Sequence, residues 1–186
     1  MLISGNKNKG LAQSLYTLYP TATFCSRATG YELTDTTDME RFAKLSTQHE
    51  VIIVNSALWR FHQSVLLDLV YKACVSAQHK AHIVVIGSTT DRVCNGKAWL
   101  YNAEKKALRD YSNTLAIGGV WGDHAPKVSY ISFGTLSNNQ HKHPDRKCLD
   151  IDAAACYIKW IIDQPRHLNI NEISVDPMQD AYWYAL

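Results

Sequence analysis

The sequence predicts an α/β fold, in which a single domain is built on a doubly wound parallel sheet. Short apolar runs that suit strands alternate along all 186 residues with amphipathic runs that suit helices. Several apolar runs, such as Val51–Val54 and Ile83–Ile86, are unbroken, as is typical of parallel strands buried on both faces. No long low-complexity linker and no obvious repeat interrupts the alternation. Right-handed crossovers can therefore join each strand to the next through a helix.

Each element follows from its local pattern. The expected strands are short runs of apolar or β-branched residues, at 1–3, 22–25, 51–54, 83–86, 128–133 and 172–175. The expected helices are amphipathic runs, at 11–18, 38–47, 63–78, 98–117 and 151–163. Leu11, Leu15 and Leu18 share one face of the first helix, and Pro20 ends it. The helix at 98–117 is the longest.

The composition and charge exclude several classes of function. The net charge is only +2 at pH 7 and the sequence pI is about 8.2, which gives no electrostatic reason to expect nucleic acid as a partner. No apolar run approaches the ~18 residues of a membrane span, and the first residues lack the features of a signal peptide. The five cysteines are scattered and include no CxxC pair. We therefore expect a cytoplasmic protein with reduced, buried thiols and no metal site.

Ligands of a doubly wound sheet bind at the carboxyl ends of the strands, and the first strand is followed by the glycine loop Ser4–Ala12 (SGNKNKGLA). A triphosphate-binding loop is excluded, because Leu11 and Ala12 stand where that loop needs a lysine and a hydroxyl. A dinucleotide-binding loop fits better, with Gly5, Gly10 and Ala12 in its three structural positions. From the loop alone, a plain connection from strand to helix is equally well supported.

Ser26 and Arg27 follow the second strand, where a dinucleotide-binding fold reads the adenosine ribose. An acidic residue at this place would bind the 2′-hydroxyl of NAD. An arginine instead suits the 2′-phosphate of NADP, through charge-assisted hydrogen bonds. The alternative is a surface arginine that binds no ligand.

Three polar side chains farther along the chain suit proton transfer coupled to hydride transfer. Tyr101 and Lys105 lie one turn apart on the same face of a helix, and Ser88 follows the strand at 83–86. An ammonium near a phenol stabilises the phenolate and lowers its pKa from about 10. A serine hydroxyl beside them can orient a carbonyl. The spacing alone is weak evidence, and its weight comes from the glycine loop upstream.

Together these segments resemble the short-chain dehydrogenase/reductase family. The matching segments are SGNKNKGLA, CSR, LTDTTD, VNSA, IGS, YNAEK and VSYISFGTL, and the region 149–177 extends the likeness over nearly the whole chain. The resemblance implies a Rossmann-type domain over residues 1–186 that binds NADP(H). It also implies that Tyr101 is the general acid/base and that Ser88 orients the substrate. Lys105 would lower the Tyr101 pKa and hold the nicotinamide ribose.

The same resemblance implies a set of cofactor contacts along the carboxyl edge of the sheet. These residues are Gly5, Asn6, Lys7, Lys9, Gly10, Leu11, Ser26, Arg27, Asp35, Asn55, Ser56, Ala57, Tyr101, Lys105, Gly134 and Thr135. The glycines would lie along the pyrophosphate, and Ser26 and Arg27 at the adenosine phosphate. Asp35 would lie at the adenine, and Thr135 near the nicotinamide amide or the phosphates.

The chain departs from the family pattern in several places. The glycine loop has one extra residue, Leu58 stands at a usual glycine, and Phe133 stands at a usual proline. The helix asparagine of the family's proton relay is missing, with Gln63 and Ser64 nearest to its place. The substrate-covering region is reduced to about residues 137–148.

The function expected from these features is NADP(H)-dependent hydride transfer to or from a small-molecule carbonyl or alcohol. The alternative is a non-catalytic NADP(H)-binding sensor or scaffold with the same fold. A sugar-nucleotide epimerase would need a larger C-terminal substrate region than this chain has. The resemblance also implies a homo-dimer or homo-tetramer assembled through the long helices.

Overall fold

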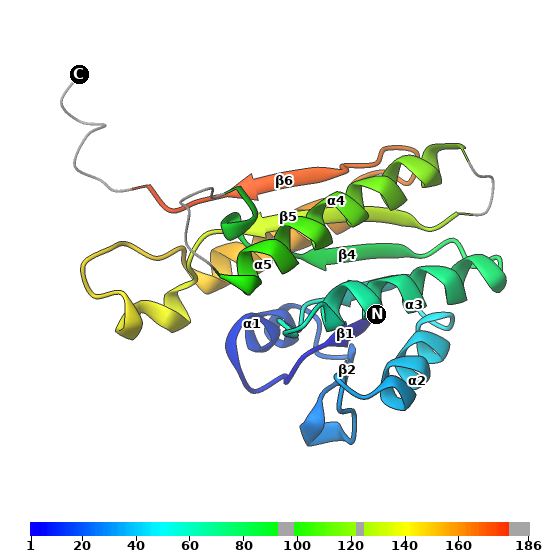
Figure 1. The fold of residues 1–186 in the computed structure, drawn as a ribbon, viewed down its shortest axis with the longest axis horizontal. Helices are drawn as coiled ribbons and strands as arrows, with labels where there is room; N and C mark the ends of the chain where they lie inside the picture. The colour runs from blue at the N-terminus through cyan, green and yellow to red at the C-terminus, as the bar shows by residue number, and fades with distance from the viewer. Residues whose placement is uncertain (93–98, 122–124, 179–186) are drawn as a thin grey trace.

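The computed structural model describes residues 1–92, 99–121 and 125–178, and Figure 1 shows their arrangement. One six-stranded, all-parallel sheet runs through the molecule in the order β2-β1-β3-β4-β5-β6. The strands are β1 (Leu2–Ser4), β2 (Thr23–Cys25), β3 (Val51–Val54), β4 (His82–Ile86), β5 (Lys127–Phe133) and β6 (Glu172–Val175). The helices are α1 (Gly10–Leu18), α2 (Thr36–Ser46), α3 (His62–Ser76), α4 (Leu100–Trp121) and α5 (Ile151–Ile162). The predicted α/β doubly wound parallel sheet is confirmed.

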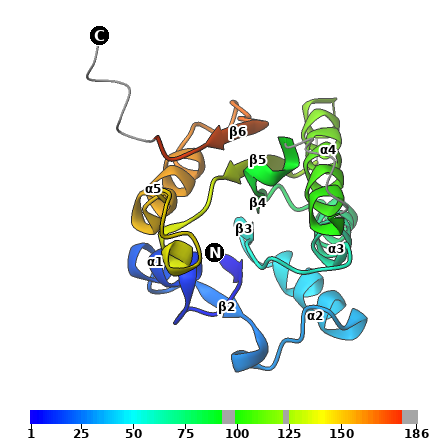
Figure 2. The same ribbon diagram turned by 60° about the vertical axis from the view of Figure 1, so that its left-hand side comes forward.

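Helices cover both faces of the sheet. Figure 2 shows α1 and α5 on one face and α2, α3 and α4 on the other. Successive strand residues point to opposite faces, so Ile52 and Val54 pack beneath α2–α4 while Ile53 packs beneath α1 and α5. All three side chains are fully buried. Burial on both faces explains why the strands read as unbroken apolar runs.

Several helix ends differ from the sequence expectation, by at most four residues. The α2 helix begins at Thr36 rather than residue 38, because the Asp35 carboxylate accepts a hydrogen bond from the Asp38 N–H and caps the helix. The α4 helix continues to Trp121, beyond the expected end at Ile117. Three short 3-10 helices were not expected: η1 (Arg27–Thr29), η2 (Thr89–Arg92) and η3 (Ser137–Lys142). They depend on local hydrogen bonds and carry no apolar periodicity.

The strand order predicts a crevice at the carboxyl edge of the sheet. The β1 strand lies between β2 and β3, and the chain leaves β1 into α1 on one face but leaves β3 into α3 on the other. Loops that diverge from neighbouring parallel strands leave a gap between them, where ligands bind in open α/β sheets. The switch point of this fold therefore lies between Ser4 and Asn55.

Four cysteines are free thiols within the part of the chain that the structure describes. Cys25 and Cys74 are buried, as expected, whereas Cys148 is half-buried and Cys156 is exposed on α5. The expectation of uniformly buried thiols was therefore wrong, and Cys94 lies outside the described residues. Among the described helices, none combines the length and the apolar composition needed to cross a membrane.

Acid is expected to destabilise the fold through His82, the first residue of β4. The ring is buried, its Nε2 lies 2.9 Å from Ser129 Oγ, and burial with the nearby Lys127 lowers the His82 pKa to about 3. Because the pKa of an unfolded histidine is about 6.5, the unfolded chain takes up the proton first as the pH falls. We expect a loss of about 4 kcal/mol of unfolding free energy between pH 6.5 and 3.

Urea unfolding at stepped pH measures this loss. The His82→Asn variant should show a shallower pH dependence than the wild type over the same range, whatever its absolute stability. The same slope in both proteins would contradict the assignment to His82.

Candidate active site

The glycine loop packs tightly against the end of β3. Gly5 has φ +149°, and a Cβ at this position would lie 2.8 Å from Asn55 Nδ2 and 3.1 Å from Ala12 Cβ. A side chain would therefore separate the loop from both neighbours. Gly10 has φ +56° and begins α1. These two positions give the loop the close backbone approach that a dinucleotide-binding loop needs.

The extra residue of the loop is taken up in a turn over Asn6–Lys9. The Lys9 N–H donates to the Asn6 carbonyl oxygen at 3.0 Å, and the Asn8 N–H donates to Asn6 Oδ1 at 3.0 Å. Lys7 Nζ lies 5.1 Å from the centroid of the Tyr16 ring, so this ammonium lies against α1. The turn leaves Lys7 and Lys9 exposed.

A buried serine holds the two sides of the crevice together. Ser4 Oγ accepts hydrogen bonds from the Asn55 N–H at 2.8 Å and the Ser56 N–H at 3.0 Å. Asn55 Nδ2 donates in return to the Ser4 carbonyl oxygen at 3.2 Å. The sequence assigned Asn55 and Ser56 to the cofactor but missed Ser4, whose only signal is its place directly before the first glycine.

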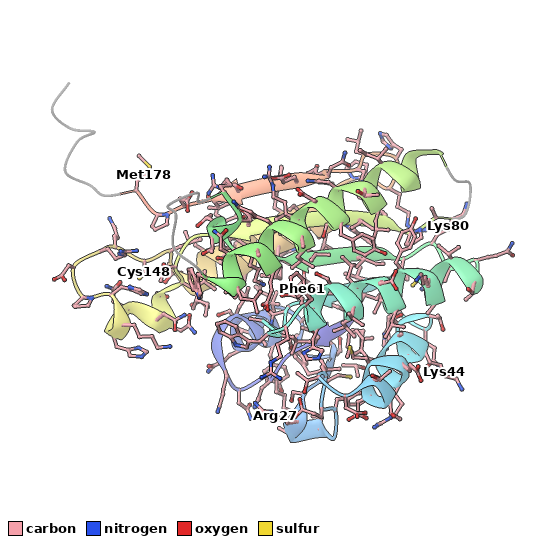
Figure 3. The ribbon with its side chains drawn as sticks, viewed as in Figure 1. Arg27, Lys44, Phe61, Lys80, Cys148 and Met178 are labelled. Atoms are coloured by element: carbon pink, nitrogen blue, oxygen red, sulfur yellow. The ribbon has the colours of Figure 1, made fainter. Side chains whose placement is uncertain are left out.

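Arg27 is the first residue of η1 and is labelled in Figure 3. Its side chain is 85% exposed, and its Nε lies 3.6 Å from Glu32 Oε2. Ser26 Oγ is buried and has no hydrogen-bond partner among the described residues. Asp35 caps α2, so one carboxylate oxygen is already occupied.

Ser88 and Tyr101 meet at the carboxyl end of β4. Ser88 lies between β4 and η2, and Tyr101 is in the first turn of α4. Burial raises the pKa of Tyr101, a hydrogen bond with Ser88 lowers it, and the nearby Glu104 and Asp91 carboxylates raise it again. The sequence expectation was a lowered pKa, but burial outweighs the other contributions. Tyr101 is therefore a phenol, not a phenolate, at neutral pH.

Lys105 is buried beneath Tyr101. Its side chain is only 3% exposed, and Nζ lies 5.4 Å from the centroid of the Tyr101 ring. Nζ donates a hydrogen bond to Gln63 Oε1 at 2.6 Å. Burial lowers the Lys105 pKa to about 8, against the opposing effect of Glu104 and Asp91. This ammonium is therefore poised to exchange a proton close to neutral pH.

Gln63 connects Lys105 to the ends of β3 and β4. Its Nε2 donates to the carbonyl oxygens of Val54 at 3.2 Å and Ile86 at 2.9 Å, the last residues of β3 and β4. Its Oε1 accepts from Lys105. One buried amide thus joins the strand end before Asn55 to the strand end before Ser88. The sequence noted Gln63 only as the residue nearest to a missing asparagine.

Two buried carboxylates lie beside the site, and the sequence assigned no role to either. Asp91 Oδ2 accepts hydrogen bonds from the Tyr130 hydroxyl at 2.7 Å and from Ser132 Oγ at 3.0 Å. Glu104 Oε1 accepts from the Arg60 N–H at 2.6 Å. Asp91 Oδ1 and Glu104 Oε2 have no hydrogen-bond partner within the described part of the chain. Both carboxylates act on the pKa of Tyr101 and of Lys105.

The turn after β3 is strained. Arg60 and Phe61 have φ values of 57° and 63°, a left-handed backbone conformation that residues other than glycine rarely adopt. Such residues cost about 1–3 kcal/mol each and persist only when the surroundings fix them. The hydrogen bond from the Arg60 N–H to Glu104 is one such restraint. Figure 3 labels Phe61 where this turn leads into α3.

A cavity of about 300 Å³ adjoins the Ser88 side of the site. Its lining residues are Thr89, Gly134, Thr135, Arg146, Lys147, Asp176 and Pro177. A Cβ on Gly134 would lie 2.7 Å from Pro177 Cδ, so this glycine allows the chain after β6 to pack closely. Gly134 and Thr135, which the sequence assigned to the cofactor, therefore border an open space next to η2.

No family model matches the chain. Two uncharacterized oxidoreductases of Staphylococcus aureus, from strains N315 and Mu50, are each 31% identical over 108 residues. The match covers 54% of this chain and 44% of each relative, so it spans less than half of their length.

Solved structures match over most of the chain. A serine dehydrogenase complexed with NADP⁺ superimposes with a TM-score of 0.71 at 13% identity, over 94% of this chain and 94% of that one. A short-chain dehydrogenase from Burkholderia cenocepacia in complex with NADP gives 0.72 at 12%, over 93% and 86%. Acetoin dehydrogenase from Enterobacter cloacae gives 0.72 at 13%, over 95% and 93%. Likeness at these identities concerns the fold, and the chain has the fold of the short-chain dehydrogenases/reductases that its motifs predict.

Proposed function

We propose that this protein is an NADP(H)-dependent oxidoreductase of the short-chain dehydrogenase/reductase type, which acts on a carbonyl or alcohol substrate. The observation that carries the proposal is the meeting of Ser88, Tyr101 and Lys105 at the carboxyl edge of the sheet, joined to the crevice by Gln63. The NADP-bound proteins of the same fold support the choice of cofactor class.

The residues of the crevice fit a dinucleotide. The Gly5 backbone has no room for a Cβ, and the N-terminus of α1 presents unpaired N–H groups to a pyrophosphate. The buried, unpartnered Ser26 Oγ lies beside Arg27, where an adenosine phosphate would be held. When bound, the nicotinamide supplies the hydride.

The side chains of the site supply the proton and the orientation. The Ser88 hydroxyl holds the substrate oxygen, and the Tyr101 hydroxyl gives that oxygen its proton as hydride reaches the carbon. The raised pKa of Tyr101 keeps the phenol protonated at neutral pH, which favours the direction of carbonyl reduction. Gln63 fixes the Lys105 ammonium below the ring, from where it can replace the proton.

Deuteride transfer tests the proposal directly. The protein is incubated with NADPH deuterated at C4 of the nicotinamide and a panel of aldehydes and ketones. We expect one deuterium on the alcohol carbon of at least one product by mass spectrometry, and much less product with Ser88→Ala. Tight NADPH binding without any deuterated product would instead support the sensor or scaffold function.

Arg27 is expected to decide the choice between NADP and NAD. Its guanidinium is exposed and forms a 3.6 Å ion pair with Glu32. Because such an exposed ion pair is weak, Arg27 can leave it at little cost to bind a 2′-phosphate. Arg27→Ala should weaken NADP⁺ binding by about tenfold or more, the value of one charge-assisted hydrogen bond, and leave NAD⁺ binding within about twofold. Isothermal titration of both cofactors measures this. Arg166→Ala, an exposed arginine near Glu50, is the control, and tighter NAD⁺ binding by the wild type would reject the assignment.

A further inference from the structure

Two exposed tryptophans pack against the ring of Tyr101. The ring centroids of Trp59 and Trp99 each lie 5.1 Å from that of Tyr101, with interplanar angles of 45° and 39°. Trp59 lies in the turn after β3 and is 58% exposed. Trp99 directly precedes α4 and is 51% exposed. Large apolar side chains that remain exposed together, next to a candidate catalytic group, mark a binding surface.

The position of Trp59 is built into the fold. It directly precedes the strained residues Arg60 and Phe61, and the Arg60 N–H is held by the buried Glu104 on the same helix as Tyr101. The His62 N–H donates to the Trp59 carbonyl oxygen at 3.3 Å, which closes the turn. The same helix therefore positions both Tyr101 and, through Glu104, the tryptophan beside it. A turn held at this conformational cost suggests a function for the residue that it presents.

Building on the proposed function, we propose that Trp59 and Trp99 form an aromatic wall that selects carbonyl substrates bearing an aromatic ring next to the carbonyl. Indole faces attract the edges and offset faces of another aromatic ring more strongly than they attract a saturated ring of the same size. The wall packs against the ring that carries the proposed proton donor, so we expect the aromatic ring and the carbonyl to be joined in one molecule.

Two ketones of equal carbon count and similar shape test the wall without turnover. Acetophenone and cyclohexyl methyl ketone are titrated into the protein with NADP⁺, which cannot reduce them, and their dissociation constants are measured by saturation-transfer difference NMR. We expect the wild type to bind acetophenone about tenfold more tightly. Trp59→Leu should bring the two dissociation constants within about twofold of each other, while Trp59→Phe should keep most of the preference.

Trp160→Leu is the matched control, because Trp160 is an exposed tryptophan on α5, away from the site, and should leave the preference unchanged. Equal binding of the two ketones by the wild type, or an unchanged preference in Trp59→Leu, would overturn the proposal. Because the readout is binding, it does not depend on the deuteride experiment. If the protein preferred acetophenone but transferred no deuteride, the aromatic wall would be supported and the proposed oxidoreductase activity would be rejected.

Discussion

Replacing Tyr101 by phenylalanine is expected to lower kcat/KM for NADPH-dependent carbonyl reduction by about 10²–10⁴-fold. The substitution removes the hydroxyl that we propose as the proton donor to the substrate oxygen, and it keeps the ring that packs against Trp59 and Trp99. The loss should fall mainly on kcat, because the aromatic contacts that we propose for substrate binding remain. Steady-state oxidation of NADPH, followed by absorbance over a range of ketone concentrations, measures both constants.

The control for this loss is Tyr157→Phe, which removes a hydroxyl from an exposed tyrosine of α5 and should change kcat/KM by less than about twofold. The dissociation constant of NADPH should change far less than kcat in Tyr101→Phe, which would place the loss in the chemical step. Equal rates for the wild type and Tyr101→Phe would remove Tyr101 from the reaction.

Replacing Gln63 by leucine is expected to lower the free energy of unfolding by about 2–4 kcal/mol and to lower activity as well. The leucine leaves Lys105 Nζ without its partner and frees the carbonyl oxygens of Val54 and Ile86, all in the interior. Buried polar groups that lose a partner cost their full desolvation free energy. Urea unfolding at pH 7 measures the stability, and single-turnover oxidation of NADPH measures the activity.

Two comparisons separate the role of Gln63 from a general loss of packing. Gln63→Glu keeps an acceptor for Lys105 and adds an opposite charge, so it should raise the Lys105 pKa and shift the pH profile of the activity toward alkaline pH. Gln13→Leu replaces an exposed glutamine of α1 and should change stability by no more than about 0.5 kcal/mol. If the pH profile of Gln63→Glu matched that of the wild type, Gln63 would have no part in positioning Lys105.

The fold, and the proximity of Ser88, Tyr101 and Lys105, could be predicted because the signals are local. Unbroken apolar runs identify buried parallel strands, and one helical turn separates Tyr101 from Lys105. The partners of these residues could not be predicted in this way. Gln63 bonds a lysine 42 residues away, and the Arg60 N–H bonds Glu104 44 residues away. Such pairs depend on how α3 and α4 pack together, which no periodicity encodes.

The pKa of Tyr101 is a second property that the sequence alone could not predict. The spacing to Lys105 predicted a lowered pKa, because an ammonium on the same helix face stabilises a phenolate. The ammonium instead donates to Gln63, and burial raises the Tyr101 pKa. Desolvation depends on everything that surrounds a group, so it becomes visible only when the whole fold is assembled.

The lengths of the outer strands bear on how the protein behaves at high concentration. A sheet edge offers unpaired N–H and C=O groups to any other chain, and long, flat edges lead to aggregation. Here one edge is β2, with three residues, and the other is β6, with four. Both edge strands are therefore too short to form an extended ladder with a strand of another molecule. The longest of the described strands, β5, is paired on both sides, by β4 and β6.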